Sequence, residues 1–290
     1  MILMAAGALM APGIHAIAKS LGGTMSAGQV SWARFFFQLA FLLPFVWIGH
    51  GGRIPWPSAS HGIRGLLLAA ATLLFFWALN YMPLATGSAI FFVEPLLLTA
   101  ISAVFLGEPI GWRRITAIAA GFAGALIVIR PSFAAVGYAA LLPLLAALCF
   151  AVYLAITRQR AARETALVTQ FWVCLFSMLA LSLAIGVGTH ASANVLRASW
   201  PAAWELLLLG GMGLIALISH RLAINAFRLA PASILAPLQY LEIFGSIALG
   251  ALIFGDLPDT LTSLGTAIIV GSGLYVFHRE RLPAGGNAQE

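Results

Sequence analysis

Two carboxylates lie inside long apolar runs of this chain, where a charged group is costly. Glu94 is followed by Pro95 in the run from Thr86 to Leu106, and Glu242 lies in a second run nearer the C-terminus. An ionisable side chain at membrane depth usually marks a substrate or ion pathway or a proton relay. The alternative is a neutral glutamic acid that is hydrogen-bonded to a neighbouring helix. We favour the pathway interpretation for both acids.

Each acid has a proline nearby that interrupts helical hydrogen bonding. Pro95 has no N–H, so the carbonyl of Phe91 loses its partner and the helix is expected to kink there. Pro237 acts in the same way on the carbonyl of Ser233. A freed carbonyl at this depth is tolerated only against protein or a water-filled cavity. Both kinks are therefore expected to face an internal site.

Further polar and aromatic residues could share this site. Gln239 and Ser246 flank Glu242 at i−3 and i+4, which gives a polar stripe on an otherwise apolar helix. Aromatic rings could stack on a flat ligand, although packing against neighbours also explains them. His15 is either a cavity residue or a packing histidine. The candidate substrate-binding or proton-coupling residues are Glu94, Glu242, Phe91, Gln239, Tyr240, Ser246, His15 and Trp77.

Two cations inside apolar runs have simpler explanations. Lys19 lies four residues after His15 and is expected to extend to the lipid headgroups. Arg34 lies near the start of the second apolar run. It could pair with an acid, but reaching outward to the membrane surface is the expected explanation. Neither cation is assigned to the site.

The composition excludes an ordinary water-soluble domain. Of 290 residues, 61% are hydrophobic and only 8% are charged, which is typical of an integral membrane protein. The net charge of +6 could indicate nucleic-acid binding, but basic residues in short loops are explained by the bilayer, so no nucleic-acid partner is expected. Cys149 and Cys174 fall within expected helices without a CxxC pattern. They predict packing residues, and neither a disulfide nor a metal site.

Windows of about 20 apolar residues predict an all-α membrane protein with ten spans. The N-terminal run lacks a basic segment and a cleavage site, so we expect it to be the first span and not a signal peptide. Ten basic residues lie in segments on the same side of the membrane as the N-terminus and three lie on the opposite side, which predicts cytoplasmic N- and C-termini. The expected spans are residues 2–18, 28–49, 62–82, 86–106, 113–130, 137–157, 166–188, 203–227, 232–254 and 260–277.

The chain repeats its own pattern. Residues 80–131 resemble residues 225–277, and an offset of 148 residues carries Glu94 onto Glu242. An upstream match of IHAIAK with YLAITR predicts five spans in each copy. Because five is odd, the second copy is expected to be inverted, as in many secondary transporters, which bind substrate between their repeats. The expected units are a first repeat in 1–131, a second repeat in 132–278 and a short cytoplasmic tail in 279–290.

The repeated motifs resemble a known family. Leu106-Gly107-Glu108 and Phe254-Gly255-Asp256 each end a helix that precedes a glycine-punctuated span, which is similar to the EamA domain of the drug/metabolite transporter superfamily. The segments WARFFFQLAFLLPFVW, IRGLLL and QYLEIFGSIALGALIFGDLPD resemble the branch with S-adenosylmethionine uptake proteins and bacterial riboflavin importers. The resemblance implies ten helices, cytoplasmic termini, a central cavity and alternating access.

These features predict a secondary transporter that moves a small organic metabolite across the bacterial inner membrane. The resemblance favours riboflavin import, with S-adenosylmethionine uptake, or export of amino acids or toxic amphiphiles, as alternatives. Two acids at mid-membrane disfavour a scaffold or channel. Neither an enzyme nor a cofactor is expected, because the chain lacks HExxH, P-loop, nucleophile-elbow and Cys/His metal patterns. Direction, proton coupling and the choice between monomer and homodimer stay open.

Overall fold

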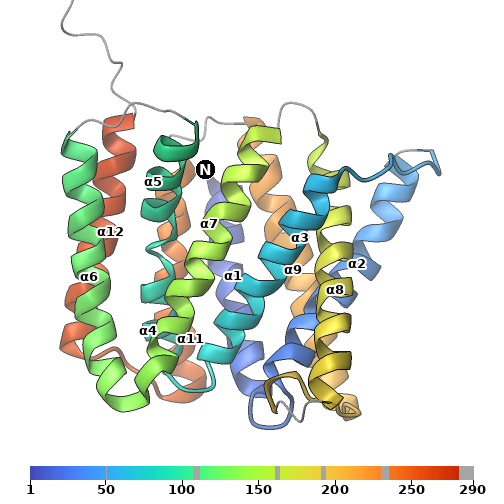
Figure 1. Cartoon of the computed structure of the whole chain (residues 1–290), viewed down its shortest axis with the longest axis horizontal. Coiled ribbons are helices and arrows are strands. Elements are labelled where there is room, and N and C mark those ends of the chain that lie inside the picture. The colour runs from blue at the N-terminus through green and yellow to red at the C-terminus, as the bar shows by residue number, and fades with distance from the viewer. Residues whose placement is uncertain (50, 107–111, 161–163, 191–193, 230–234, 281–290) are drawn as a thin grey trace, which may run out of the picture.

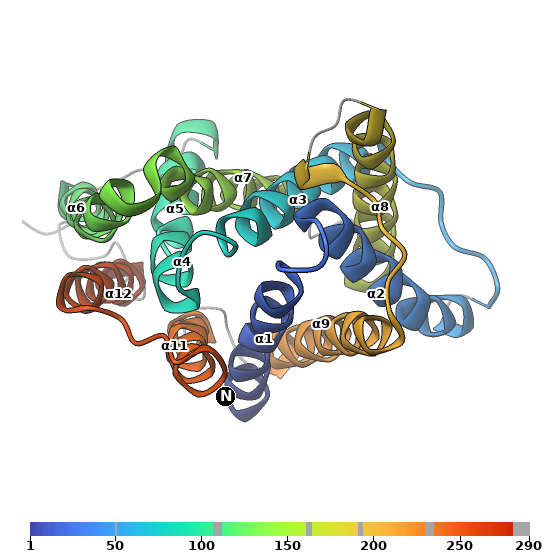
Figure 2. The same cartoon turned by 90° about the horizontal axis from the view of Figure 1, so that it is seen from below.

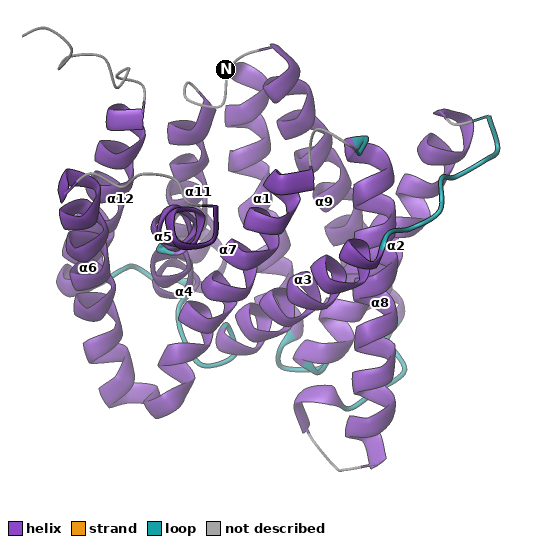
Figure 3. Ribbon diagram, turned by 45° about the horizontal axis from the view of Figure 1, so that its top comes forward, coloured by secondary structure: helices purple, strands orange, loops and turns teal. Residues whose placement is uncertain are grey.

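The computed structural model is a bundle of long helices, and the residues that it describes contain no strand (Figure 3). It describes residues 1–49, 51–106, 112–160, 164–190, 194–229 and 235–280. The expected tail beyond residue 280, Gly107, Glu108 and Ser233 lie outside the described residues. The helices are α1 Ile2–Leu21, α2 Ala27–Gly49, α3 Ala59–Ala78, α4 Leu84–Phe91, α5 Glu94–Leu106, α6 Trp112–Val136, α7 Leu142–Arg160, α8 Ala166–His190, α9 Ala203–Leu229, α11 Leu241–Phe254 and α12 Thr260–Glu280, with short 3-10 segments η1 Gly137–Leu141, η2 Asn194–Leu196 and η3 Ala236–Tyr240.

Many of the described helices are long and apolar enough to cross a bilayer. Because a backbone in lipid must satisfy its hydrogen bonds internally, helices are the expected structure of such runs. The predicted all-helical membrane fold is confirmed, whereas the division into ten spans stays a prediction. Seven segments meet the length and composition of a span: Ile2–Leu21, Ala27–Gly49, Ala59–Ala78, Leu84–Ser102, Ile115–Arg160, Ala166–Gly188 and Ala203–Ala226. The shorter apolar helices are Leu238–Phe254 and Thr260–Val276.

The helices are arranged around a central group. α6 packs against α12 at one edge of the bundle, and α2 packs against α8 towards the other (Figures 1 and 2). Between these edges lie α1, α3, α4, α7 and α11, where α1 contacts α9 and α11, and α7 contacts α3 and α5. α1 begins and α12 ends at the same side of the bundle (Figure 1). The expected site residues are carried mainly by this central group.

Glycines let α6 and α12 approach each other closely. A Cβ atom added to Gly124 would lie 2.9 Å from the carbonyl oxygen of Gly265, and one added to Gly265 would lie 2.6 Å from that of Gly124. Such contact between backbones requires small residues on both helices. Gly273, further along α12, faces the hydroxyl of Tyr240 instead.

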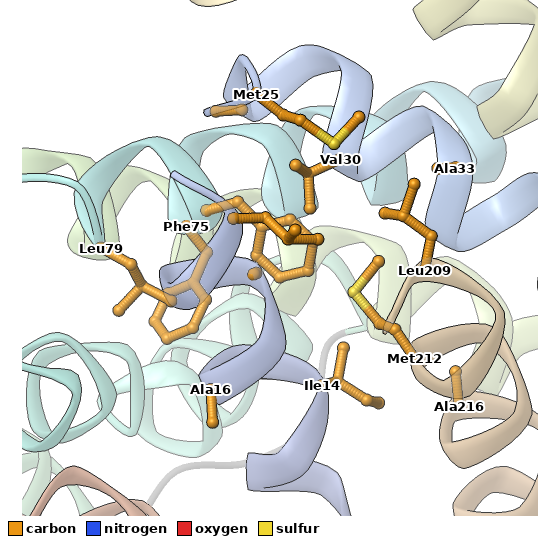
Figure 4. Close-up of a cluster of buried hydrophobic side chains, with 14 of the residues drawn as sticks. Ile14, Ala16, Met25, Val30, Ala33, Phe75, Leu79, Leu209, Met212 and Ala216 are labelled. Atoms are coloured by element: carbon orange, nitrogen blue, oxygen red, sulfur yellow. The ribbon is translucent and has the colours of Figure 1, made fainter. Parts of the chain in front are cut away.

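A buried apolar cluster fixes the position of α1. It joins α1, α2, α3 and α9 through Ile14, Val30, Phe75 and Met212, which are at most 6% exposed (Figure 4). Interiors are close-packed, so these side chains hold their helices in one register. Because Ile14 is adjacent to His15 in the chain, the cluster also fixes where that polar side chain emerges.

Candidate functional site

Both mid-bundle acids lie in the first turn of a helix. The N–H of Val93 bonds to the carbonyl of Ile90, three residues back, at 3.2 Å, so regular helical bonding stops there and α5 begins at Glu94. Glu242 is the second residue of α11, directly after the 3-10 segment η3. Unpaired backbone N–H groups and the positive end of the helix dipole favour a carboxylate at such a position. The helix start therefore lowers the cost of each charge.

The two prolines predicted to kink these helices lie at the same interruptions. Pro95 is the second residue of α5, and Pro237 lies in the first turn of η3. Proline fits the first turn of a helix because its missing N–H would have no partner there. α4 and α5 are consequently separate helices, and a 3-10 segment precedes α11.

Glu94 lies in apolar and aromatic surroundings. It is 8% exposed, and its Oε1 has no hydrogen-bond partner among the described residues. The ring of Phe92, two residues earlier, lies 5.6 Å from the ring of Tyr240 on η3. Glu94 is within electrostatic reach of both Tyr240 and Glu242. The packing of α4 against α11 thus brings the two acids into one region.

Glu242 has a different environment, with basic groups from two other helices. Its Oε1 lies 3.8 Å from Nδ1 of His15 on α1, and both side chains are partly exposed, at 21% and 17%. A separation of 3.8 Å exceeds a hydrogen bond but allows an ion pair when the histidine is protonated. Arg34 on α2 also acts electrostatically on Glu242. The predicted residues His15 and Glu242 are therefore neighbours.

A chain of aromatic rings leads away from His15. The His15 and Phe75 ring centres are 4.7 Å apart, edge to face, and Phe75 and Phe91 are 5.0 Å apart. Phe91 continues to Phe150 at 5.6 Å, and Phe150 to Tyr153 at 5.5 Å. These contacts connect α1, α3, α4 and α7. The predicted residue Phe91 therefore lies in the interior, beside an aromatic wall that could contact a flat ligand.

The remaining predicted residues differ in their surroundings. Ser246 is fully buried and accepts a hydrogen bond of 3.0 Å from Ser88, which is a contact between α11 and α4. Gln239 lies partly buried in η3. Trp77 donates to Tyr81 at 3.3 Å and lines a pocket of about 560 Å³ at the end of the bundle where α1 meets α2. This pocket is separate from the two acids.

Arg34 points towards another helix and not, as was expected from the sequence, towards the membrane surface. Its Nη1 donates to Oγ1 of Thr72 on α3 at 2.7 Å, and its guanidinium carbon lies 4.8 Å from the centre of the Phe35 ring. Its Nε is buried. The expectation that Arg34 reaches outward was wrong, because its partner lies on another helix. The available signal was the spacing of Ser31, Arg34 and Gln38, which puts three polar residues on one helical face.

Lys19 also turns inward. Its Nζ pairs with the carboxylate of Asp256 just beyond α11 and lies 4.7 Å from the centre of the Phe254 ring. The expectation that Lys19 extends to the headgroups was wrong. The attracting acid is distant in sequence and becomes a neighbour only because α1 packs against α11.

A second polar cluster joins α3 to α8. Arg64 is fully buried, its Nη2 donates to Oε2 of Glu164 at 2.6 Å, and its Nε donates to the carbonyl of Ser60 at 3.2 Å. Thr169 donates to the same oxygen of Glu164 at 2.9 Å. Burial alone would raise the pKa of Glu164, but these hydrogen bonds and the charge of Arg64 outweigh it and hold the pKa below its usual range. The charges of Arg64 and Glu164 therefore satisfy each other, whereas Nε2 of His61, 3.3 Å from Oε2 of Glu164, has no hydrogen-bond partner among the described residues.

The described ranges contain no group of three or more His, Cys, Asp or Glu side chains that could hold a metal. Cys149 and Cys174 are free, and Cys174 is buried. The groups gathered at the centre are two carboxylates, a histidine, an arginine and a row of aromatic rings. Such groups can bind and release a charged organic molecule or exchange protons with it.

The first half of the chain matches a known family model. The match to the EamA-like transporter family covers residues 1–130. Those residues are an EamA-like transporter domain. The family resemblance predicted from the sequence is thus confirmed. Together with the apolar helices, this match supports a multi-pass membrane protein of the bacterial inner membrane.

Curated relatives match the chain over most of its length. An S-adenosylmethionine uptake transporter of Rickettsia bellii is 29% identical over 269 residues, covering 91% of this chain and 88% of the relative. A riboflavin transporter of Rhizobium johnstonii is 29% identical over 266 residues, covering 89% and 84%. A solved crystal structure superposes with a TM-score of 0.61 at 22% identity, covering 97% of this chain and 98% of its own, which supports the fold.

Proposed function

We propose that this chain is a secondary transporter that takes up a small organic metabolite by alternating access, with S-adenosylmethionine and riboflavin as the substrates to test first. The observation that carries the proposal is the pair of carboxylates, Glu94 and Glu242, in the first turns of two interrupted helices and within electrostatic reach of each other. Transporters commonly bind substrates and coupling ions at discontinuous helices near mid-membrane. The names of the relatives supply the two substrates.

We further propose ten spans in two inverted halves, residues 1–131 and 132–278. The pattern of helix contacts supports this. α1 packs against α9 as α7 packs against α3, and α3 packs against α8 as α9 packs against α2. In each of these two cases, the contact between a pair of helices is matched by the contact between their expected counterparts. This exchange is what a two-fold relation between the halves would produce.

Two close glycine contacts support the same relation. A Cβ atom added to Gly65 of α3 would lie 2.5 Å from the Cβ of Phe176, and one added to Gly213 of α9 would lie 2.5 Å from the Cβ of Phe37. The two glycines are 148 residues apart, as the two acids are. The two phenylalanines are 139 residues apart, which is the offset of the match between IHAIAK and YLAITR.

The two acids have different proposed roles. Glu242, with His15 at 3.8 Å and Arg34 nearby, binds the polar part of the substrate. Glu94, which has no ionic partner within the described ranges, exchanges a proton. Movement at the break between α4 and α5, and at η3, would open the site alternately to the two sides. Hinges of this kind absorb backbone rotation at element ends.

Uptake by purified protein in lipid vesicles tests the proposal. We expect saturable uptake of labelled S-adenosylmethionine or riboflavin that the unlabelled compound competes away, and a lower rate when an ionophore collapses the pH gradient. Vesicles of both orientations would establish direction. Unsaturable flux would indicate a channel and contradict the proposal. Growth of a riboflavin-requiring strain at low riboflavin provides a separate test of riboflavin import.

A further inference from the structure

Arg34 lies within electrostatic reach of side chains from several helices. It is bonded to α3 through Thr72, and it acts on titratable side chains of five further helices. These side chains are His15 of α1, Tyr153 of α7, Cys174 of α8, His220 of α9 and Glu242 of α11. A cation that only supported the surface of α2 would not lie among so many helices.

The hydrogen-bonding capacity of Arg34 is largely unused. Thr72 occupies Nη1, and no hydrogen bond within the described part of the chain reaches the edge formed by Nε and Nη2. One turn to either side on α2, Ser31 is fully buried and Gln38 is 4% exposed. The Ser31 hydroxyl and the Gln38 Oε1 also lack partners among the described residues. Buried polar groups normally have hydrogen-bond partners, so this face of α2 has hydrogen-bonding groups that a bound molecule could use.

The charge of Arg34 is also uncompensated at contact distance. No carboxylate of the described residues lies within 4.0 Å of its guanidinium, and Glu242 acts on it only from farther away. An arginine at membrane depth normally pairs with an acid or with carbonyl groups. The free edge of a guanidinium matches a carboxylate, which can accept two parallel hydrogen bonds from it.

We propose that Arg34 binds a carboxylate of the transported molecule while Glu242 faces its cationic group, so that the substrates are zwitterions with an amino-acid-like moiety. This inference rests on the proposed function and narrows it. S-adenosylmethionine carries a carboxylate, an ammonium group and a sulfonium cation. Riboflavin carries no carboxylate, so it lacks the group that Arg34 would bind.

Matched pairs of molecules that differ by one carboxylate test the proposal. We would measure how well S-adenosylmethionine and decarboxylated S-adenosylmethionine compete for uptake of labelled S-adenosylmethionine into vesicles. In the wild type, the carboxylated compound should compete about 10- to 100-fold better, as expected for charge-assisted hydrogen bonds. Arg34→Gln should abolish this preference, and Arg34→Lys should restore part of it because lysine keeps the charge but not the planar fork.

Arg221→Gln is the matched control. Arg221 is on α9, and its guanidinium carbon lies 4.9 Å from the centre of the Phe45 ring. Arg34 has a similar contact with the ring of Phe35. This variant should keep the wild-type preference. A structural role for Arg34 would lower the amount of folded protein without changing the ratio of the two competitors. Retention of the preference in Arg34→Gln would therefore overturn the proposal.

A binding measurement separates this inference from the transport proposal. The melting temperature of the detergent-purified protein would be measured with S-adenosylmethionine, tryptophan and histidine, each beside its decarboxylated counterpart. Stabilisation by a carboxylated member only, lost in Arg34→Gln, would support the carboxylate site even without transport. Equal effects within every pair would exclude the site. Saturable riboflavin uptake that Arg34→Gln leaves unchanged would support the transport proposal and contradict the role of Arg34.

Discussion

Two arginines of this protein lie inside the bundle, and they differ in whether a carboxylate pairs with them. Arg64, on α3, is fully buried and bonds to the Glu164 carboxylate and to the backbone and hydroxyl of Ser60. Arg34, on α2, is partly buried and bonds only to the Thr72 hydroxyl among the described residues. Both sequence positions are arginines near the start of an apolar helix. Only their neighbours differ.

The difference indicates which charges hold the fold and which are available to a ligand. A buried ion pair has already offset its desolvation, so removing one partner exposes the full cost of the other. A cation without a carboxylate partner makes no such contribution to stability. We therefore expect the Arg64 cluster to govern stability and the region of Arg34, Glu242 and Glu94 to govern transport.

The largest expected effect is on stability, at the satisfied cluster. Arg64→Gln leaves Glu164 without its cation and should lower the free energy of unfolding by roughly 3–5 kcal/mol. Arg34→Gln should change it by less than about 1 kcal/mol, because no ion pair is broken. Unfolding of the purified proteins in detergent measures both. Equal losses in the two variants would remove the distinction between the arginines.

The next effect is on transport, at the two acids. Glu242→Gln should reduce uptake on the order of 100-fold, because a charge-assisted contact of about 3 kcal/mol is lost. Glu94→Gln should abolish accumulation driven by a pH gradient but preserve exchange of labelled for unlabelled substrate, which needs no net proton movement. The amount of folded protein in the membrane should stay near the wild-type amount in both variants. Wild-type flux in both variants would remove the acids from the site.

The acids and their prolines could be predicted from the sequence because each is exceptional in an apolar run. Glu94 and Glu242 are acidic residues in runs that are otherwise mostly apolar, and Pro95 can only be accommodated at a helix start. Phe91 was named as a candidate together with the acids, and its ring packs in the interior against Phe75 and Phe150. These inferences depend on local chemistry, which the order of residues already contains.

The partners of the cations could not be predicted in this way. Thr72 meets Arg34, and Asp256 meets Lys19, only through the packing of helices that are far apart in the chain. Ser246 satisfied the spacing rule for a polar stripe, yet its hydroxyl is used by Ser88. Helical periodicity identifies residues that share a face, but it does not say which neighbouring helix that face meets.

A smaller effect should appear as a pH dependence of the satisfied cluster. The pKa of Glu164 is held below its usual range by Arg64 and Thr169, against the opposing effect of burial. Its stabilising contribution is therefore present above the unfolded-state pKa of about 4.3 and is lost as the pH falls through the lower folded-state value. The melting temperatures of wild type and Glu164→Gln should differ at pH 7 and converge under acid. A constant difference would assign the effect to packing instead of charge.

The smallest expected effect concerns the pair formed by Lys19 and Asp256, which is intermediate between the two arginines. The lysine is paired, as Arg64 is, but the side chains are 17% and 28% exposed, so solvent weakens their attraction. A double-mutant cycle with Lys19→Gln and Asp256→Asn should give a coupling of about 0.2–1 kcal/mol in the free energy of unfolding. Repeating the cycle at high salt should reduce it. A coupling near 3 kcal/mol that does not change with salt would instead show that this pair stabilises the fold as strongly as the buried Arg64 cluster does. Solvent exposure would then not explain which charged groups of this protein contribute to stability.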